Sequence, residues 1–81
     1  MGERQETSDS RAEAIVVEEL ERKGWRESDL REKAKGDPDK LAMAVRLRAE
    51  SAVTVKWIAE RLQMGTPGYL IHLLYRNRRK K

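Results

Sequence analysis

Apolar residues recur at helical spacing in separate short stretches of the chain, and capping residues mark the ends of these stretches. The first stretch places four apolar residues on one side of a helix: Ala12, Ile15, Val16 and Leu20. Its start is expected at one of three good capping residues, Ser8, Asp9 or Ser10. Gly24 suits a helix C-cap in the left-handed backbone conformation, after which Trp25 can fold back onto the helix. The pattern therefore predicts a first helix that ends at about residue 23.

Two further helices are expected in the middle of the chain. Ser28 is a candidate cap for a short helix over residues 29–35, which Gly36 would end. The pair Asp37-Pro38 then predicts a sharp helix start, because Asp caps well and Pro suits the first helical position. This third helix should reach about residue 50. Its expected buried stripe is Leu41, Ala44, Val45 and Leu47 or Arg48.

The last two predicted helices follow each other closely. Thr54 can cap a helix over residues 55–64, and Gly65 should end it. Thr66 can cap the final helix, with Pro67 at its first position. The inward stripe of this helix is expected to be Leu70, Leu73, Leu74 and Asn77.

These elements predict an all-α domain of four to five short helices over residues 9–77. Strand-like alternation of any length is missing from the sequence. Residues 1–8 are polar and non-periodic and are expected to be disordered. Residues 78–81 form a basic tail. We interpret residues 54–76 as a helix-turn-helix, in which the second helix is exposed along one side and suits a DNA major groove.

Composition argues against an enzyme. The chain has 81 residues, of which 38% are apolar and none is Phe, so its core must be small and aliphatic. A deep pocket for a small-molecule substrate is not expected in such a core. With no Cys and the single histidine His72, neither a thiolate zinc site nor a multi-His site can form. We therefore expect no catalysis, no metal and no cofactor.

The sequence contains no apolar run as long as a membrane span or the core of a signal peptide. We therefore expect no membrane association and a cytoplasmic, bacterial protein.

The net charge of +4 is divided unevenly along the chain. Residues 1–40 hold nine Lys/Arg and twelve Asp/Glu, whereas residues 41–81 hold nine Lys/Arg and two Asp/Glu. The basic half contains the predicted helix-turn-helix, which is the electrostatic pattern of a nucleic-acid binder. A solvated tail is the alternative, since five of the nine positive charges lie at 76–81. The first helix is acidic, and its carboxylates Glu18, Glu19 and Glu21 are interpreted as a solvated face.

The final helix carries an unusual set of side chains away from its inward stripe: Tyr69, Ile71, His72, Tyr75 and Arg76. If exposed, these residues require a partner, and His72 and Arg76 lie one turn apart, where both can reach bases or phosphates. Alternatively, Ile71 and Tyr75 complete the core against the first helix. Gly68 allows a close approach of the backbone, either to a phosphate or to the preceding helix.

Three segments also resemble a known family: ELERKGWRESDL (19–30), KGDPDKLAMAVRLRAES (35–51) and TVKWIAERLQMG (54–65), followed by a Leu pair at 73–74. Together they resemble the C-terminal appendage of bacterial tyrosine transposases associated with repetitive extragenic palindromes. In that family a separate N-terminal domain cuts single-stranded DNA with a His-hydrophobe-His pair and a tyrosine. The pair is absent from this sequence, so the resemblance implies a DNA-binding appendage without the catalytic domain.

Double-stranded DNA is therefore the expected partner. Thr66, Tyr69, His72 and Arg76 are predicted to contact the groove or its walls. Phosphate contacts are predicted for Lys56, Arg61 and the 78–81 tail, including Arg78 and Arg79. One alternative is a protein-interaction module, such as a homodimer joined through Ile71, Leu74 and Tyr75. Another is a binder of single-stranded or structured nucleic acid, with Trp57 or the tyrosines stacked on bases.

Overall fold

The computed structural model describes residues 8–79, and within α5 it describes the side chains as far as Asn77. This part of the chain is all-α, as the sequence pattern predicts. Its five helices are α1 (Ser8–Lys23), α2 (Glu27–Glu32), α3 (Pro38–Glu50), α4 (Val55–Arg61) and α5 (Pro67–Arg79). The predicted disorder of the N-terminus falls mostly on residues 1–7, which lie outside the described residues, whereas Ser8 already belongs to α1.

The short helix α2 differs from the prediction at both ends. It begins at Glu27 rather than after Ser28, because the Asp29 carboxylate accepts a hydrogen bond of 2.7 Å from the Arg26 backbone N–H and closes the first turn. It ends at Glu32, since the backbone of Lys33 is already extended. Leu30 is the buried residue of this helix. Such a small apolar contribution supports no more than a short helix.

The start of α3 is confirmed, but its predicted buried stripe is correct only at Ala44 and Leu47, since Leu41 is half-buried and Val45 is exposed. The Asp37 carboxylate accepts hydrogen bonds from the backbone N–H groups of Asp39 and Lys40, and Pro38 is the first helical residue. The buried residues are Lys40, Met43, Ala44 and Leu47. Val45 is instead 37% exposed. The stripe is displaced because Lys40, which sequence patterns treat as a surface residue, is buried at its start.

The helix α4 ends three residues earlier than predicted. Thr54 caps it as expected, accepting a hydrogen bond of 3.0 Å from the Trp57 backbone N–H. Gln63, however, has φ = 57° and leaves the helical conformation before Gly65, whose φ is 84°. Leu62 and Met64 remain fully buried in the turn that follows. This turn, residues 62–66, joins α4 to α5.

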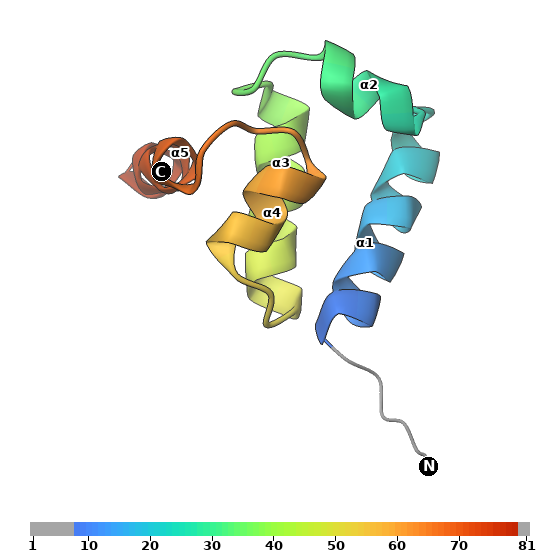
Figure 1. Cartoon of the computed structure of the whole chain (residues 1–81), viewed down its shortest axis with the longest axis horizontal. Helices are drawn as coiled ribbons and strands as arrows, with labels where there is room; N and C mark the ends of the chain where they lie inside the picture. Colours follow the sequence, from blue (N-terminus) through green and yellow to red (C-terminus); the bar gives the residue numbers. More distant parts are fainter. Residues whose placement is uncertain (1–7, 80–81) are drawn as a thin grey trace.

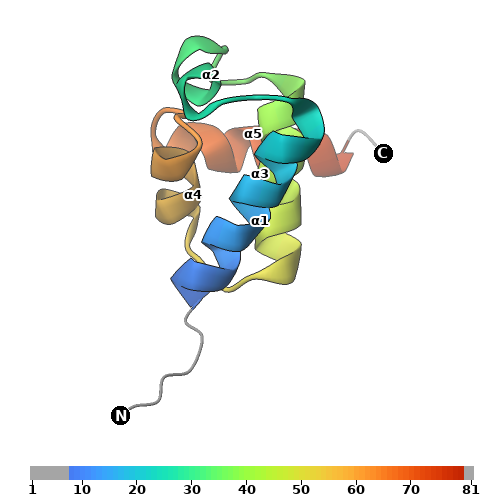
Figure 2. The same cartoon turned by 90° about the vertical axis from the view of Figure 1, so that its right-hand side faces the viewer.

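The helices α1 and α5 lie on opposite sides of α3 and α4 (Figure 1), and α5 runs across the direction of α3 (Figure 2). The packing contacts agree, because α1 packs mainly on α3, whereas α5 packs on α4 and α3. The core is aliphatic, as the composition predicts, and includes Val16, Leu30, Leu47, Ile58, Leu62 and Leu70. This arrangement separates the acidic first helix from the last helix.

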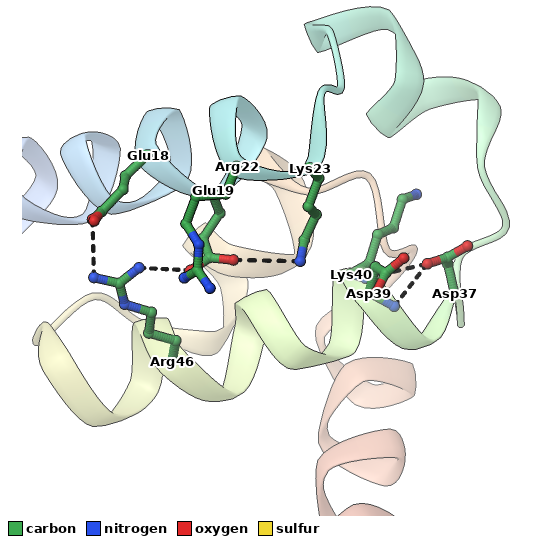
Figure 3. A network of polar contacts seen from close by, with 8 residues as sticks. All are labelled: Glu18, Glu19, Arg22, Lys23, Asp37, Asp39, Lys40 and Arg46. Carbon is green, nitrogen blue, oxygen red and sulfur yellow. Dashed lines mark hydrogen bonds and ion pairs between the residues drawn. The ribbon is translucent and has the colours of Figure 1, made fainter.

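An ion-pair network joins α1 to α3 (Figure 3). Arg46 bonds to Glu19 at 2.6 Å and to Glu18 at 3.0 Å, and it also pairs with Glu50. Burial opposes the charge of Glu19, but hydrogen bonds from Arg46 and Lys23 leave the pKa of its carboxyl below the usual range. The prediction of a solvated acidic face is therefore wrong for Glu19, which is only 6% exposed. Its role is to hold α1 on α3.

The fully buried ammonium group of Lys40 connects three segments. It donates hydrogen bonds of 3.0 Å to the backbone carbonyls of Lys33 and Gln63. These carbonyls follow the C-terminal ends of α2 and α4, where the helix dipole favours a positive charge. Burial lowers the pKa of Lys40, and the nearby carboxylate of Asp37 opposes this shift. Lys40 thus secures the turn that leads into α5.

Among residues 8–79, the structure contains no helix with the length and apolar character needed to cross a membrane.

Candidate nucleic-acid interface

The outer surface of α5 is exposed, as its side-chain pattern suggested. Tyr69 is 41% exposed, Ile71 54% and Tyr75 57%, and His72 and Arg76 are exposed as well. The alternative in which Ile71 and Tyr75 complete the core is therefore wrong. Leu70 is fully buried, and Leu73 and Leu74 pack against the core. These leucines hold the helix on the core, whereas the fourth predicted inward residue, Asn77, is exposed.

Helical spacing divides the exposed residues of α5 between two flanks. Tyr69, His72 and Arg76 are three and four residues apart and share one side of the helix, which we call the polar flank. Ile71 and Tyr75 share the other side with the partly buried Leu74, and we call this side the apolar flank. The two flanks can therefore contact different partners.

The start of α5 is stabilised by Thr66. Its hydroxyl oxygen accepts a hydrogen bond of 3.1 Å from the Tyr69 backbone N–H, which is the bond of a capping residue. The hydroxyl proton remains available to donate to an acceptor on a partner. A side chain at Gly68 would meet only the Thr66 hydroxyl, at 3.9 Å. Close packing against α4 therefore does not explain this glycine, and the open space beside it leaves room for a phosphate at the helix N-terminus.

Tyr69 leans toward the loop between α2 and α3. A Cβ atom added to Gly36 would lie 2.9 Å from the Tyr69 hydroxyl oxygen, which is too close for an ordinary contact. The absence of a side chain at Gly36 thus lets the Tyr69 ring rest against this loop. Tyr69 therefore lies at the edge of the polar flank, while remaining 41% exposed.

Lys56 lies on the surface of α4. Its side chain is 74% exposed and pairs with Glu60 at 3.7 Å within the same helix. An exposed pair of this kind contributes little to stability and is readily exchanged. Lys56 is therefore available for a phosphate contact.

The predicted phosphate contact of Arg61 is not supported by its geometry. Its guanidinium donates four hydrogen bonds of 2.6–2.9 Å, two to Glu13 of α1 and two to Glu27 of α2. The side chain is only 20% exposed. The hydrogen bonds from Arg61 lower the pKa of Glu13, and both carboxylates raise the pKa of Arg61. A guanidinium satisfied in this way holds α1, α2 and α4 together rather than facing a phosphate.

We expect Arg61→Gln to lower stability without changing the salt dependence of DNA binding. Loss of two bidentate charge-assisted pairs, each partly open to solvent, should cost about 1–2 kcal/mol of unfolding free energy. The measurement is urea unfolding, alongside duplex binding at two salt concentrations. A reduced salt dependence at unchanged stability would assign Arg61 to the interface instead.

In the part of the chain that the structure describes, α5 borders a smaller and a larger hollow, and the sequence pattern revealed neither. The smaller, of about 270 Å³, is lined by Val45, Arg48, Val55, Ile71, Leu74, Tyr75 and Asn77. The larger, of about 590 Å³, is lined by Gly36, Pro38, Leu41, Ala42, Val45, Leu73, Arg76 and Asn77. Val45 borders both hollows, and it had been predicted to lie in the core. Only the crossing of α5 over α3 brings these side chains together.

The remaining candidates contribute less. Arg78 and Arg79 extend the backbone of α5, but the predictions for their side chains, and for residues 80–81, lie outside the described part of the structure. Trp57 is half-buried and packs against the core, so it offers only part of its ring for stacking on a base. Across residues 8–79, no group of three or more His, Asp or Glu side chains is arranged to hold a metal ion.

The chain matches no family model, no curated protein and no solved structure at a level that would show relatedness.

Proposed function

We propose that this domain binds double-stranded DNA by placing the polar flank of α5 in the major groove. The observation that carries the proposal is the exposure of this flank on α5, a helix that lies on the side of the domain opposite the acidic helix α1 (Figure 1). The segment from Arg61 to Lys81 contains no Asp or Glu. A helix with an exposed polar side and no acidic residue suits the negative potential of a DNA groove.

In this proposal each exposed group has a separate role. His72 and Arg76, four residues apart, face base edges or the phosphates beside them. Tyr69 donates its hydroxyl proton at the groove wall. Thr66 and the open backbone near Gly68 receive a phosphate at the N-terminus of α5. Lys56, together with Arg78 and Arg79, adds phosphate contacts.

The resemblance to a transposase appendage adds a biological context to the proposal. We infer a DNA-binding module that is either associated with a bacterial transposase or acts as a regulator, and that works in the cytoplasm. The role is binding alone, since the paired histidines of the family's catalytic domain are missing from this sequence. Incubation with single-stranded DNA and divalent metal ions provides a check, because cleavage would contradict this role.

Replacing the two principal side chains of the polar flank should weaken DNA binding. We expect His72→Ala combined with Arg76→Ala to cost about 1–3 kcal/mol of binding free energy, because contacts to bases or phosphates are lost. Both side chains are exposed, so the fold should persist. Fluorescence anisotropy with a labelled duplex at low salt measures the effect, and circular dichroism checks that the helices remain.

The matched control lies on the opposite side of the domain. Glu18→Ala combined with Glu21→Ala changes two exposed residues of α1 and removes negative charge. Binding should be unchanged or slightly tighter in this variant. If the α1 variant abolishes binding while the α5 variant is silent, α5 is not the DNA-contacting element and the proposal is wrong.

A further inference from the structure

We propose that the smaller hollow, between α3 and the apolar flank of α5, binds an acidic amphipathic helix of a partner protein. This surface is distinct from the polar flank to which we assign DNA. The proposal rests on two features of the hollow: its exposed apolar residues, and a cation, Arg48, that has no carboxylate partner and no acidic neighbour in the lining among residues 8–79.

The apolar part of this surface comes from elements that are distant in the sequence. Val45 of α3 is 37% exposed, and Ile71 and Tyr75 of α5 are 54% and 57% exposed, yet all three line one hollow. Val55 and Leu74 complete the apolar lining. Apolar side chains gathered in a recess, rather than scattered singly, are typical of a site that receives side chains of a partner.

The charge of the hollow specifies the chemistry of that partner. Arg48 belongs to the lining, and within residues 8–79 it forms no ion pair. Arg46, two residues earlier, is by contrast paired with three carboxylates. A carboxylate on the partner would therefore find an unneutralised guanidinium next to the apolar recess.

Other occupants fit this combination less well. A second copy docked through the same surface would bring two Arg48 side chains together, and like charges oppose association. A DNA phosphate would pair with Arg48 but would leave the exposed side chains of Val45 and Ile71 uncovered. With a volume of about 270 Å³, the hollow is also below the range of most small-molecule sites. An amphipathic helix supplies apolar anchors at helical spacing and carboxylates beside them, and so satisfies both parts of the surface.

The test uses synthetic helical peptides and the intact chain. The probe carries leucines at positions i, i+3, i+4 and i+7, with glutamates on its remaining positions. One control peptide keeps the leucines and replaces glutamate by lysine, and another keeps the composition but scrambles the order. Chemical-shift changes at the Val45 and Ile71 methyl groups report binding. We expect the acidic amphipathic peptide to bind at micromolar to millimolar concentration. Neither control peptide should bind.

Two substitutions locate the site. Val45→Glu places a carboxylate at the recess and should lower the affinity for the acidic peptide by about tenfold or more. Val17→Glu is the matched control, because Val17 is a similarly exposed valine, at 42%, on the far helix α1. This variant should bind as the original chain does. Arg48→Glu should transfer the preference from the acidic peptide to the lysine peptide.

Several results would overturn the proposal. These are equal binding of all three peptides, no binding of the acidic peptide at millimolar concentration, and equal effects of Val45→Glu and Val17→Glu. Sedimentation showing a dimer that Val45→Glu dissociates would make a second copy the occupant. Duplex binding by the same variants is measured separately, so that failure here leaves the DNA proposal standing.

Discussion

Affinity for duplex DNA should fall by about two to three orders of magnitude when the salt concentration rises fourfold. The expectation follows from about four to six Lys/Arg contacts to phosphate, each of which releases counterions from the DNA. The basic residues proposed to supply these contacts are Lys56, Arg76, Arg78, Arg79 and the tail at 80–81. Arg46 and Arg61 are not among them, because both are neutralised by carboxylates within the fold.

Titration of a labelled duplex at several salt concentrations measures this dependence. Lys56→Gln should make the slope of log affinity against log salt shallower by about 1, which corresponds to the loss of one phosphate contact. Arg61→Gln serves as the control, since it removes a positive charge without removing a proposed phosphate contact. If the affinity hardly changes with salt, or if no duplex binds at low salt, an apolar protein interface becomes the better description of α5.

Replacement of Lys40 by methionine should lower the unfolding free energy by about 2 kcal/mol, within a range of about 1–3 kcal/mol. Methionine fills nearly the same space, so the change isolates the ammonium group. Its loss leaves the carbonyls of Lys33 and Gln63 without their donor. It also removes the positive charge that lies beyond the C-terminal ends of α2 and α4.

Thermal and urea unfolding measure this effect. For a domain of this size, a loss of 1 kcal/mol corresponds to a decrease of about 4–8 °C in the melting temperature. Lys56→Met is the matched control, because Lys56 is an exposed lysine whose removal should change stability by less than about 0.5 kcal/mol. A Lys40→Met variant more stable than the original chain would show that removing a buried charge outweighs the two hydrogen bonds.

Helix positions were predictable where a local capping signal was strong. Asp37 and Pro38 specify the start of α3, and Thr54 specifies the start of α4, because each cap acts within its own turn. Where a helix end depends on tertiary contacts, the prediction was wrong. The end of α4 at Arg61 is set by the left-handed backbone at Gln63, whose carbonyl is bonded to Lys40 from another helix.

In the candidate site, too, the features that depend on local sequence were predictable, and those that depend on tertiary contacts were not. Helical spacing alone separated the inward leucines of α5 from Tyr69, His72 and Arg76, because a repeat of 3.6 residues assigns sides without reference to the rest of the fold. Whether Ile71 and Tyr75 would be buried could not be predicted, since exposure depends on which helix covers them. The structure leaves them exposed, because α1 packs on the opposite side of α3 and α4.

The sequence by itself determined the all-α class, the strongest helix starts, the aliphatic core and the uneven distribution of charge. These properties depend on residue type and on neighbours within a few positions. Only the tertiary structure decided which charges remain available to a partner. Arg46, Arg48 and Arg61 carry the same guanidinium, but carboxylates from α1 and α2 reach Arg46 and Arg61 and do not reach Arg48. Ion pairing across distant segments is a property of three-dimensional proximity, which local sequence patterns do not contain.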